Sequence, residues 1–273
     1  MDPIFLDALA VWHNLTPGDV RATARVLIIH GISEHSGRHQ NTISYLTRSG
    51  FEVVSFDLRG SGRSGGRRQW IESFHDYIED ASHVFNWIGS NLNPLPLFIL
   101  GHSLGGAIAT YFAAEYWKVI HGLVLSAPAY RVGNAISPVL LKASHLLAKL
   151  TPGIRISKSG NPNAISRDLR CVKEYQQDPL CYHFNTVRQA TEVLNAIENL
   201  PKIASKIYCP TLIVHGTGDR IILLEGSFDI MKTLPSKDKT FHIFPGGFHE
   251  LHNDWDKELY FSNLRFWLNN HLL

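Results

Sequence analysis

The residues that could carry out chemistry begin with a single serine. Ser103 lies in a Gly-His-Ser-Leu-Gly sequence from Gly101 to Gly105, directly after the apolar run at residues 97–100. An apolar run that stops at a glycine, followed by a serine and more glycines, indicates a strand that turns sharply into a helix. Such an elbow strains the serine backbone, exposes its hydroxyl as a nucleophile and aims the N–H of Leu104 at the same space. The alternative is a tight turn whose serine only caps the following helix.

A serine hydroxyl becomes a nucleophile when a histidine removes its proton, and that histidine needs a carboxylate to hold its tautomer. His249 follows the expected strand at residues 239–244, and Asp219 follows the expected strand at residues 211–215. Like Ser103, both come at the carboxyl end of an expected parallel strand, where open α/β sheets bind ligands. The order serine, acid, histidine is the one found in α/β-hydrolases. We therefore expect Ser103, Asp219 and His249 to form a catalytic triad.

Other histidines and aspartates compete for these roles. Among the 15 histidines, His242 lies within an expected strand and His252 on the first turn of an expected helix. The histidine of the glycine-rich loop is therefore favoured as the base. Asp229 and Asp254 fall on expected helices and are expected to be solvated. The remaining alternative for Asp219 is a turn aspartate, which its neighbouring glycines would suit.

Acyl transfer also needs two donors for the oxyanion of the tetrahedral intermediate, each worth roughly 2.7–4 kcal/mol when aimed correctly. The backbone N–H of Leu104 is one candidate. The other is expected in the loop after the apolar run at residues 25–29, where Ile32 follows His30 and Gly31. Because a backbone group donates, the Ile32 side chain is free to line the pocket.

Apolar runs that alternate with helical patterns must position these residues. Continuous runs, rather than alternating ones, are typical of strands buried on both faces of a parallel sheet. Such a run occurs at residues 25–29, and further strands are expected at residues 51–56, 97–100, 122–126, 211–215 and 239–244. Together with the intervening helices they predict an α/β fold with a mostly parallel central sheet flanked by helices. Residues 10–13, followed by a Thr-Pro-Gly-Asp turn at residues 16–19, predict an early hairpin.

The strand pattern is interrupted between residues 131 and 205. No good strand is expected there, and helical segments are expected at residues 138–150, 166–177 and 186–200. We therefore expect an α/β-hydrolase core of residues 1–130 and 206–273, with a helical cap of residues 131–205 inserted over the strand ends.

The first cap helix is more apolar than one buried helix face requires. This suits either an acyl tunnel and a lipid surface, or ordinary packing on the core. Its apolar residues are Ile136, Val139, Leu140, Leu141, Leu146, Leu147 and Leu150. Nearby Lys142, Lys149 and Lys158 would aid contact with anionic lipid or simply be solvated.

Composition excludes several classes of function. The 273 residues carry 26 Lys+Arg and 24 Asp+Glu, and this balance argues against nucleic acid as a partner. Three cysteines without a Cys-x-x-Cys pattern predict neither a disulfide framework nor a zinc site. No signal peptide and no membrane span are expected, because no window approaches about 18 apolar residues. We expect a cytoplasmic protein, with any membrane contact peripheral and through the cap, and the sequence leaves the oligomeric state open.

A glycine-rich loop at residues 57–66 invites a phosphate-binding interpretation. It lacks the Gly-Lys-Ser/Thr ending of a P-loop and does not open directly into an apolar helix. We therefore interpret it as a structural turn.

Several segments spread over almost the whole chain resemble the monoacylglycerol lipase and lysophospholipase branch of the α/β-hydrolase superfamily. The matching residues are His30-Gly31 with Glu34-His35-Ser36-Gly37-Arg38, residues 57–64, residues 101–106, Asp178-Pro179-Leu180, residues 216–220 and residues 248–252. The resemblance implies the triad, a helical cap, and hydrolysis of single-chain acyl esters with no metal and no cofactor.

The resemblance also implies that four residues lie near the polar, glycerol-like end of the substrate. They are Glu34, Arg38, Tyr175 and His252. From residue chemistry alone, a surface salt-bridge cluster is an equal alternative. At Ile32-Ser33 the chain departs from relatives, in which smaller residues are common, and this could narrow the pocket.

These observations predict a serine hydrolase that cleaves a monoacylglycerol to fatty acid and glycerol through an acyl-enzyme. A lysophospholipase or general carboxylesterase is the alternative within enzymes. A haloalkane dehalogenase or epoxide hydrolase is disfavoured, because those enzymes place an aspartate where Ser103 stands. A catalytically inactive hydrolase fold that serves as a binding protein is the alternative outside enzymes.

Overall fold

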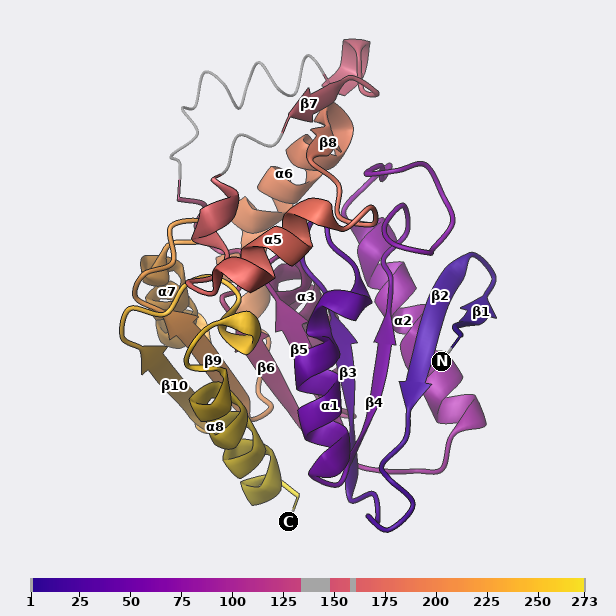
Figure 1. The fold of residues 1–273 in the computed structure, drawn as a ribbon, viewed down its shortest axis with the longest axis vertical. Coiled ribbons are helices and arrows are strands. Elements are labelled where there is room, and N and C mark those ends of the chain that lie inside the picture. Colours follow the sequence, from indigo (N-terminus) through magenta and orange to yellow (C-terminus); the bar gives the residue numbers. More distant parts are fainter. Residues whose placement is uncertain (1, 134–147, 158–160, 273) are drawn as a thin grey trace.

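A computed structural model describes residues 2–133, 148–157 and 161–272 of the chain (Figure 1). The expected cap helix at residues 138–150 lies mostly outside the described residues. Of the apolar residues assigned to it, only Leu150 is described, and of the three nearby lysines only Lys149 is described. Its last three residues, 148–150, are helical.

An eight-stranded sheet forms the centre of the molecule, in the order β1-β2-β4-β3-β5-β6-β9-β10. Strand β2 pairs antiparallel with both neighbours, and the other six strands, β4, β3, β5, β6, β9 and β10, run parallel to one another. This confirms the predicted α/β-hydrolase fold with a mostly parallel sheet. The strands are β1 (Ile4–Leu6), β2 (Leu9–Asn14), β3 (Ala24–Ile29), β4 (Phe51–Phe56), β5 (Leu97–His102), β6 (Gly122–Ser126), β9 (Thr211–Gly216) and β10 (Lys239–Phe244).

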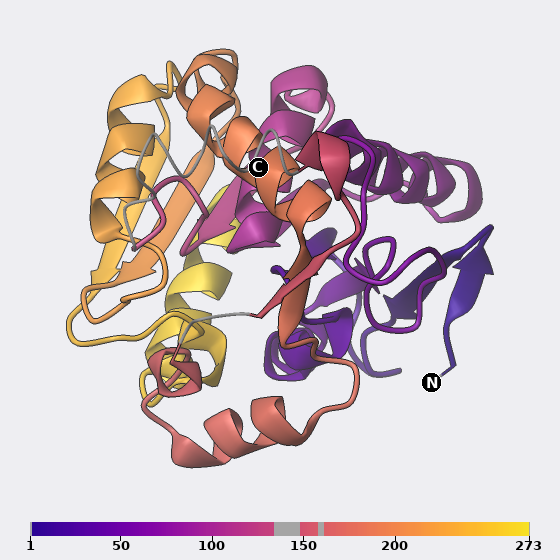
Figure 2. The same ribbon diagram turned by 90° about the horizontal axis from the view of Figure 1, so that it is seen from above.

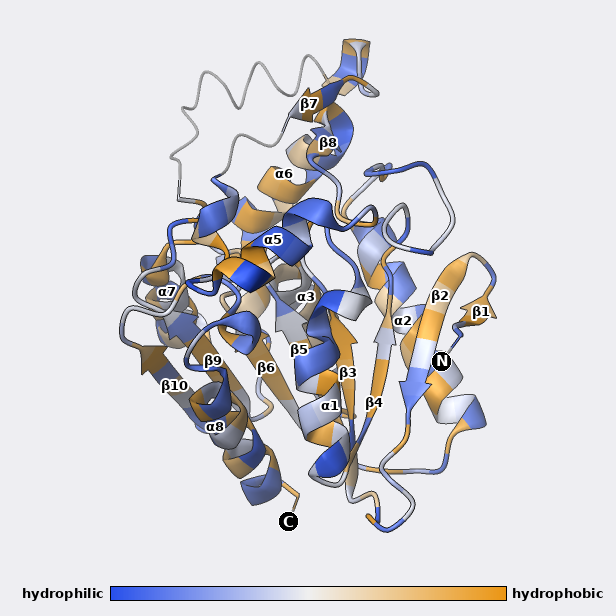
Figure 3. Cartoon of the chain, viewed as in Figure 1, coloured by the Kyte–Doolittle hydropathy of each residue, from blue (hydrophilic) through white to orange (hydrophobic). Residues whose placement is uncertain are grey.

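Helices cover both faces of this sheet, because its strands are apolar on both sides. In β3, for example, Leu27 and Ile29 belong to one buried cluster, and Val26 and Ile28 belong to the other. One face packs against α1 (Gln40–Arg48) and α8 (Lys257–Asn270). The other packs against α2 (His75–Asn91), α3 (Leu104–Tyr116), α6 (Val187–Ala204) and α7 (Leu224–Thr233). Figure 3 shows hydrophobic central strands and mixed colouring along α1 and α8.

The early hairpin forms one turn earlier in the chain than the sequence predicted. The hairpin joins β1 to β2, with Leu6 opposite Leu9 and Asp7 at a φ of 52° between them. The turn at residues 16–19 instead connects β2 to β3, because β2 pairs with the later strand β4, where Trp12 lies opposite Ser55. Turn chemistry marks where the chain reverses, but it does not identify the strand that becomes the partner.

Two short strands correct the expectation that residues 131–205 hold none. Strands β7 (Arg155–Ser157) and β8 (Phe184–Thr186) form a small antiparallel sheet. Three residues are too few to show a period of two, so no pattern marked them. The same stretch contains α5 (Leu169–Gln177) and the whole of α6, close to the expected helices. Figures 1 and 2 show β7, β8 and α5 at the end of the sheet where the parallel strands terminate.

Candidate active site

Ser103 occupies a strained turn between β5 and α3. Its backbone has φ 53° and ψ −119°, a combination that residues with side chains rarely adopt and that persists only where surrounding structure enforces it. A Cβ atom at Gly101 would overlap the carbonyl oxygen of Gly105, and one at Gly105 would overlap that of Ile29. Both glycines are therefore required by close backbone packing.

Ser103 and His249 line the same cavity, which has a volume of about 310 Å³. One side of the cavity comes from the carboxyl ends of the sheet strands and the loops that follow them. The other side comes from the segment between β6 and β9. The lining residues are Gly31, Ile32, Glu34, His102, Ser103, Asn161, Pro162, Ile165, Tyr175, His183, Ile221, His249 and Glu250.

Asp219 holds the His249 ring in place through a hydrogen bond to its Nδ1. The ring Nδ1 of His249 lies 2.7 Å from Asp219 Oδ2. The other carboxylate oxygen, Oδ1, accepts the N–H groups of Ile221 at 2.8 Å and Ile222 at 3.0 Å. Burial opposes ionisation of Asp219, but His249 and the hydrogen bond from His215 outweigh it and hold the pKa of this carboxyl well below its usual range.

His215 is a partner of this carboxylate that the sequence did not single out. Its Nε2 lies 3.1 Å from the Ile222 carbonyl oxygen, which can only accept, so Nε2 carries the proton and Nδ1 accepts the Ser227 hydroxyl at 2.7 Å. The same Nε2 lies 3.2 Å from Asp219 Oδ2. His215 is the last residue but one of the buried strand β9, and this position near the strand end was the available signal.

Opposing effects set the pKa of His249. Burial alone would lower it, but the Asp219 carboxylate, through its charge and its hydrogen bond, outweighs burial and raises the pKa above the usual value. The nearby carboxylates of Glu250 and Glu34 act in the same direction. The environment therefore favours the imidazolium that forms when a histidine accepts a proton.

His102 lies beside His249 without adding charge. The two ring centroids are 4.8 Å apart. The Nδ1–H of His102 donates to the Ser126 carbonyl at 3.2 Å. Burial first, and then His249, lower the pKa of His102 to about 3. The residue before the serine is therefore neutral near pH 7.

The residues expected to supply the two oxyanion donors are Leu104, which follows the serine, and Ile32, which lines the same cavity as the serine. Leu104 is the first residue of α3, so its N–H has no carbonyl partner within the helix. Ile32 lies on the cavity in the loop after β3. That loop is fixed on its N-terminal side by the His30 ring, which donates to the Gly31 carbonyl at 2.8 Å and accepts the Leu58 N–H at 2.9 Å.

The four residues expected near a polar substrate end divide into two pairs. Glu34 and Tyr175 line the cavity. Glu34 accepts the Gly31 N–H, and although burial opposes its ionisation, the hydrogen bond from His39 helps to hold its pKa well below the usual value. Arg38 and His252 are not among the lining residues, and both are buried rather than part of a surface cluster.

Arg38 and His252 instead build the layer behind the cavity. Arg38 Nη2 donates to Glu250 Oε2 at 2.7 Å and lies 3.1 Å from Cys171 Sγ. The His252 ring stacks on the His39 ring at 4.5 Å. Residues that line the cavity and that sequence reasoning missed are Asn161, Pro162, Ile165, His183, Ile221 and Glu250. Only Glu250 had a signal, its position next to His249.

The competing aspartates take other roles. Asp229 on α7 forms an exposed ion pair with Arg131 at 2.6 Å. Asp254 corrects the expectation of a solvated helix residue, because it is only 2% exposed and lies before α8. Its carboxylate accepts the Phe248 N–H at 2.8 Å and pairs with Arg167 at 2.9 Å. It therefore supports the loop that carries the histidine.

The loop at residues 57–66 has the structural role that the sequence predicted. The Asp57 carboxylate accepts the N–H of Ser36 at 2.8 Å and of Arg63 at 2.7 Å. The first bond ties the loop to the turn before α1, and the second closes the loop on itself.

Among the described residues, no helix combines the length and the apolar character needed to cross a membrane.

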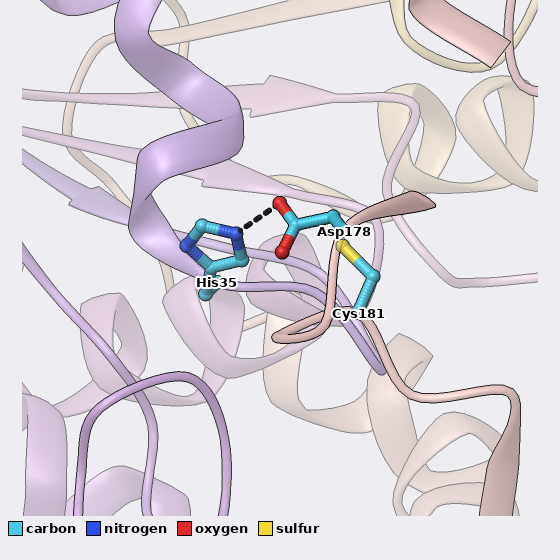
Figure 4. Close-up of side chains that lie close together, drawn as sticks. All are labelled: His35, Asp178 and Cys181. Carbon is cyan, nitrogen blue, oxygen red and sulfur yellow. Dashed lines mark hydrogen bonds and ion pairs between the residues drawn. The ribbon is translucent and has the colours of Figure 1, made fainter. Parts of the chain in front are cut away.

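One trio within the described part of the chain has the side chains of a metal site, namely His35, Asp178 and Cys181 (Figure 4). His35 Nδ1 accepts the Gly37 N–H, so its Nε2 carries the proton and donates to Asp178 Oδ2 at 2.8 Å. Burial raises the pKa of the Cys181 thiol, which keeps it protonated. A hydrogen bond between two parts of the chain accounts for this arrangement.

Comparison with known proteins agrees with this geometry. The chain is 32% identical over 248 residues to a monoacylglycerol lipase of Mycolicibacterium smegmatis. The alignment covers 90% of this chain and 88% of the relative. It is 31% identical to a monoglyceride lipase of Rattus norvegicus, with 85% of this chain and 77% of the relative covered.

The crystal structure of a monoacylglycerol lipase from Paleococcus ferrophilus superposes with a TM-score of 0.87 at 31% identity, covering 96% of this chain and 99% of that one. Residues 20–256 match the model of the family described as "Serine aminopeptidase, S33". The chain therefore belongs to this α/β-hydrolase family, and it is a serine hydrolase related to the monoacylglycerol lipases.

Proposed function

We propose that the chain hydrolyses monoacylglycerols, with Ser103 as nucleophile, His249 as general base and Asp219 as the group that orients His249. The observation that carries this proposal is the 2.7 Å contact between His249 and Asp219, on a cavity that also exposes the strained Ser103. The similarity to monoacylglycerol lipases supports the same substrate class.

In the proposed reaction, His249 takes the proton of the Ser103 hydroxyl as its oxygen attacks the ester carbonyl carbon. The N–H groups of Leu104 and Ile32 donate to the resulting oxyanion. His249 then returns the proton to the glycerol oxygen, and the C–O bond breaks to leave an acyl-enzyme. A water molecule, deprotonated by His249, releases the fatty acid and restores Ser103.

The chemistry of the cavity favours a neutral head group. Glu34 and Glu250 place two carboxylates on its surface, and the cation that pairs with Glu250 lies behind the lining. Hydroxyl groups of glycerol can donate to carboxylates, whereas the phosphate of a lysophospholipid would be repelled. Ile32, Ile165 and Ile221 supply apolar surface for the acyl chain.

We also propose that residues 131–205 act as a cap over a core of residues 1–130 and 206–273. This segment supplies Asn161, Ile165 and His183 to the cavity. Exposed apolar residues in it, Leu150, Ile154 and Ile156, support peripheral contact with a lipid surface. The three cysteines are unpaired and buried, which fits the reducing cytoplasm.

Replacing Ser103 by alanine tests this function. Ser103→Ala should abolish labelling by a fluorophosphonate probe and lower kcat on monooleoylglycerol by about 10⁴-fold or more, with an unchanged circular dichroism spectrum. Full activity in this variant would refute the nucleophile. Faster hydrolysis of lysophosphatidylcholine than of monooleoylglycerol by the parent would refute the head-group assignment alone. If the parent protein is folded but hydrolyses no ester, the alternative of an inactive hydrolase fold that serves as a binding protein would be favoured.

A further inference from the structure

His215 is a fully buried histidine to which the proposed reaction gives no role. It lies near the carboxyl end of β9, and 0% of its surface is exposed. A buried imidazole loses its hydrogen bonds to water, so both of its ring nitrogens need partners within the protein. Both nitrogens of His215 have such partners, and all of these partners lie outside β9. The ring therefore connects separate parts of the chain close to Asp219.

The Nδ1 side of the ring is bound to α7. Nδ1 accepts the Ser227 hydroxyl at 2.7 Å, and Ser227 is itself fully buried. This bond fixes the rotation of the His215 ring and leaves the ring proton on Nε2. A hydroxyl that donates to one ring nitrogen also makes the N–H group on the other nitrogen a stronger donor, because hydrogen bonds in a chain polarise one another. Helix α7 thus supports the Nε2–H group as a donor.

The Nε2–H group faces two oxygens of the loop after β9. Nε2 lies 3.1 Å from the Ile222 carbonyl oxygen and 3.2 Å from Asp219 Oδ2. The hydrogen bond from His215 is one of the interactions that hold the pKa of the Asp219 carboxyl well below its usual range. Asp219 Oδ2 is also the oxygen that lies 2.7 Å from His249 Nδ1. Two histidines therefore share one carboxylate oxygen.

The backbone already determines where the Asp219 carboxylate lies. The Gly218 N–H donates to the Gly247 carbonyl at 2.9 Å, and this bond ties the loop of Asp219 to the loop of His249. Carboxylate Oδ1 accepts two further backbone N–H groups, as described above. Only Oδ2 is bound by side chains alone. Its side-chain partners therefore set the final orientation of the carboxylate and the charge that reaches His249.

We infer that His215 is a positioning residue of the triad, which anchors the Asp219 carboxylate to α7 and shares Oδ2 with His249. An N–H group that donates to Oδ2 offsets part of the negative charge that holds a proton on His249. His215 therefore orients the carboxylate and also keeps the base from binding its proton too tightly. This inference rests on the proposed function, because it assumes the roles that the proposed reaction gives to Asp219 and His249.

Several titratable groups face His249, and they come from both sides of the cavity. They are Asp219, His102, Glu34, Glu250, Tyr175 and His183. Among the contacts of the described residues, His215 touches only Asp219 of this group. A change in the titration of His249 after replacement of His215 would therefore report on the contact with Asp219.

Three variants and one control separate this role from simple packing. His215→Phe keeps a ring of similar size and removes both nitrogens, whereas His215→Gln restores an N–H donor near the position of Nε2. Ser227→Ala removes only the anchor on α7. Thr211→Val is the matched control, because Thr211 is also fully buried in β9 and loses a hydrogen bond, to the Cys209 carbonyl at 3.1 Å, at the other end of the strand.

The measurements are kcat and KM on p-nitrophenyl butyrate and the rate of labelling by a fluorophosphonate probe, each as a function of pH. His215→Phe should lower kcat and the labelling rate about tenfold, because the base is less well oriented, while KM changes less than about twofold. The midpoint of the pH profile should rise by about 0.5–1 unit, because the charge on Oδ2 is less compensated.

The other variants should follow in order of what they remove. His215→Gln should stay within about threefold of the parent, with a midpoint close to the parental one. Ser227→Ala should lose about threefold and raise the midpoint slightly, because the Nε2–H group becomes a weaker donor. The double variant of His215→Phe and Ser227→Ala should lose no more than His215→Phe, because both changes act through one ring.

The inference fails if His215→Phe keeps the parental labelling rate and pH midpoint, or if Thr211→Val causes the same changes. It also fails if His215→Gln loses as much as His215→Phe, or if the double variant shows the product of the separate losses. If His215→Phe does not fold, Ser227→Ala carries the test, and a parental rate and midpoint in it would overturn the inference.

Failure of the proposed function can be told apart from failure of this inference, because the labelling ratios do not depend on which ester the parent prefers. A parent that reacts with the probe but does not hydrolyse monooleoylglycerol would refute the proposed substrate, and the expected ratios would still support the inference. A parent that does not react with the probe would overturn both.

Discussion

The cavity has two sides that are built in different ways. On the sheet side, Ser103, Asp219 and His249 follow the ends of β5, β9 and β10, whose backbones are paired along their whole length. On the opposite side, Asn161, Ile165 and His183 come from short helices, turns and loops. Backbone pairing holds the first group to one geometry, whereas the second can be replaced without altering a strand.

This difference indicates that the two sides of the cavity have different roles. A reaction that requires alignment within fractions of an ångström is placed where the sheet determines positions, and selection of the substrate is placed where side chains can change. Substitutions on the sheet side should therefore act mainly on kcat, and those on the opposite side mainly on KM.

The largest effect should come from Asp219→Asn. The amide would present an N–H to His249 Nδ1 and favour the wrong tautomer, so kcat should fall by about 10⁴-fold with the fold retained. Steady-state kinetics with a p-nitrophenyl ester measures this. Asp229→Asn, in an exposed ion pair, is the control and should keep full activity. A loss below tenfold in Asp219→Asn would mean that the sheet side does not carry the chemistry.

Arg38→Met tests the connection between the two sides, because Arg38 contacts Glu250 after β10 and Cys171 on α5. Breaking a buried ion pair leaves one charge uncompensated, so the free energy of unfolding should fall by about 3 kcal/mol. Urea denaturation followed by circular dichroism measures the change. Arg48→Met, at an exposed position, should stay within about 0.5 kcal/mol of the parent. Equal stability of the two variants would show that the sides are held together by other contacts.

Tyr175→Leu tests the opposite side alone. Tyr175 lines the cavity from α5, and its loss should raise KM for monooleoylglycerol about tenfold while kcat changes less than about threefold. Tyr208→Leu, at an exposed tyrosine, is the matched control. A drop in kcat as large as that of Asp219→Asn would remove the distinction between the sides.

The pH dependence of kcat/KM should be set by His249, which belongs to the sheet side of the cavity. Burial lowers the pKa of His249, but Asp219 outweighs it, so the pKa is raised. Because the base must be unprotonated, kcat/KM should rise with pH around a midpoint above about 6.5, the usual histidine value. The protonated form is stabilised in the fold, so this contribution to stability is complete below about pH 6.5 and is lost as pH rises through the raised pKa. The midpoint should be unchanged in Tyr175→Leu, and a shift there would contradict the division.

Much of the sheet side could be predicted from the sequence, because its signals are local. The continuous apolar runs reveal buried parallel strands, and the glycines around Ser103 reveal the close packing of the elbow. The positions of Asp219 and His249 follow from the same strand ends. The strand β2 shows where this reasoning stops, since its partner β4 is defined only by the completed sheet.

The opposite side could not be predicted in the same way. Strands β7 and β8 are three residues long, and the helices expected there indicate existence but not which residues face the cavity. Ser33 and Asn185 are 152 residues apart in sequence and meet only after the cap segment folds back. Arg38 was expected beside the substrate, but its guanidinium group forms an ion pair with Glu250. Both side chains are buried, and the spacing of residues in the sequence does not reveal this burial.

The adjacent strands β6 and β9 are separated in the chain by the whole segment that forms the far side of the cavity. Doubling the length of a flexible connection adds only about 0.6 kcal/mol of closure entropy. The junctions after β6 and before β9 are therefore suitable places to graft a segment from another hydrolase and so change the accepted ester. A grafted segment would have to re-form the contacts that the present segment makes with the core, such as the hydrogen bonds of Tyr182 and Asn185 to Ser33.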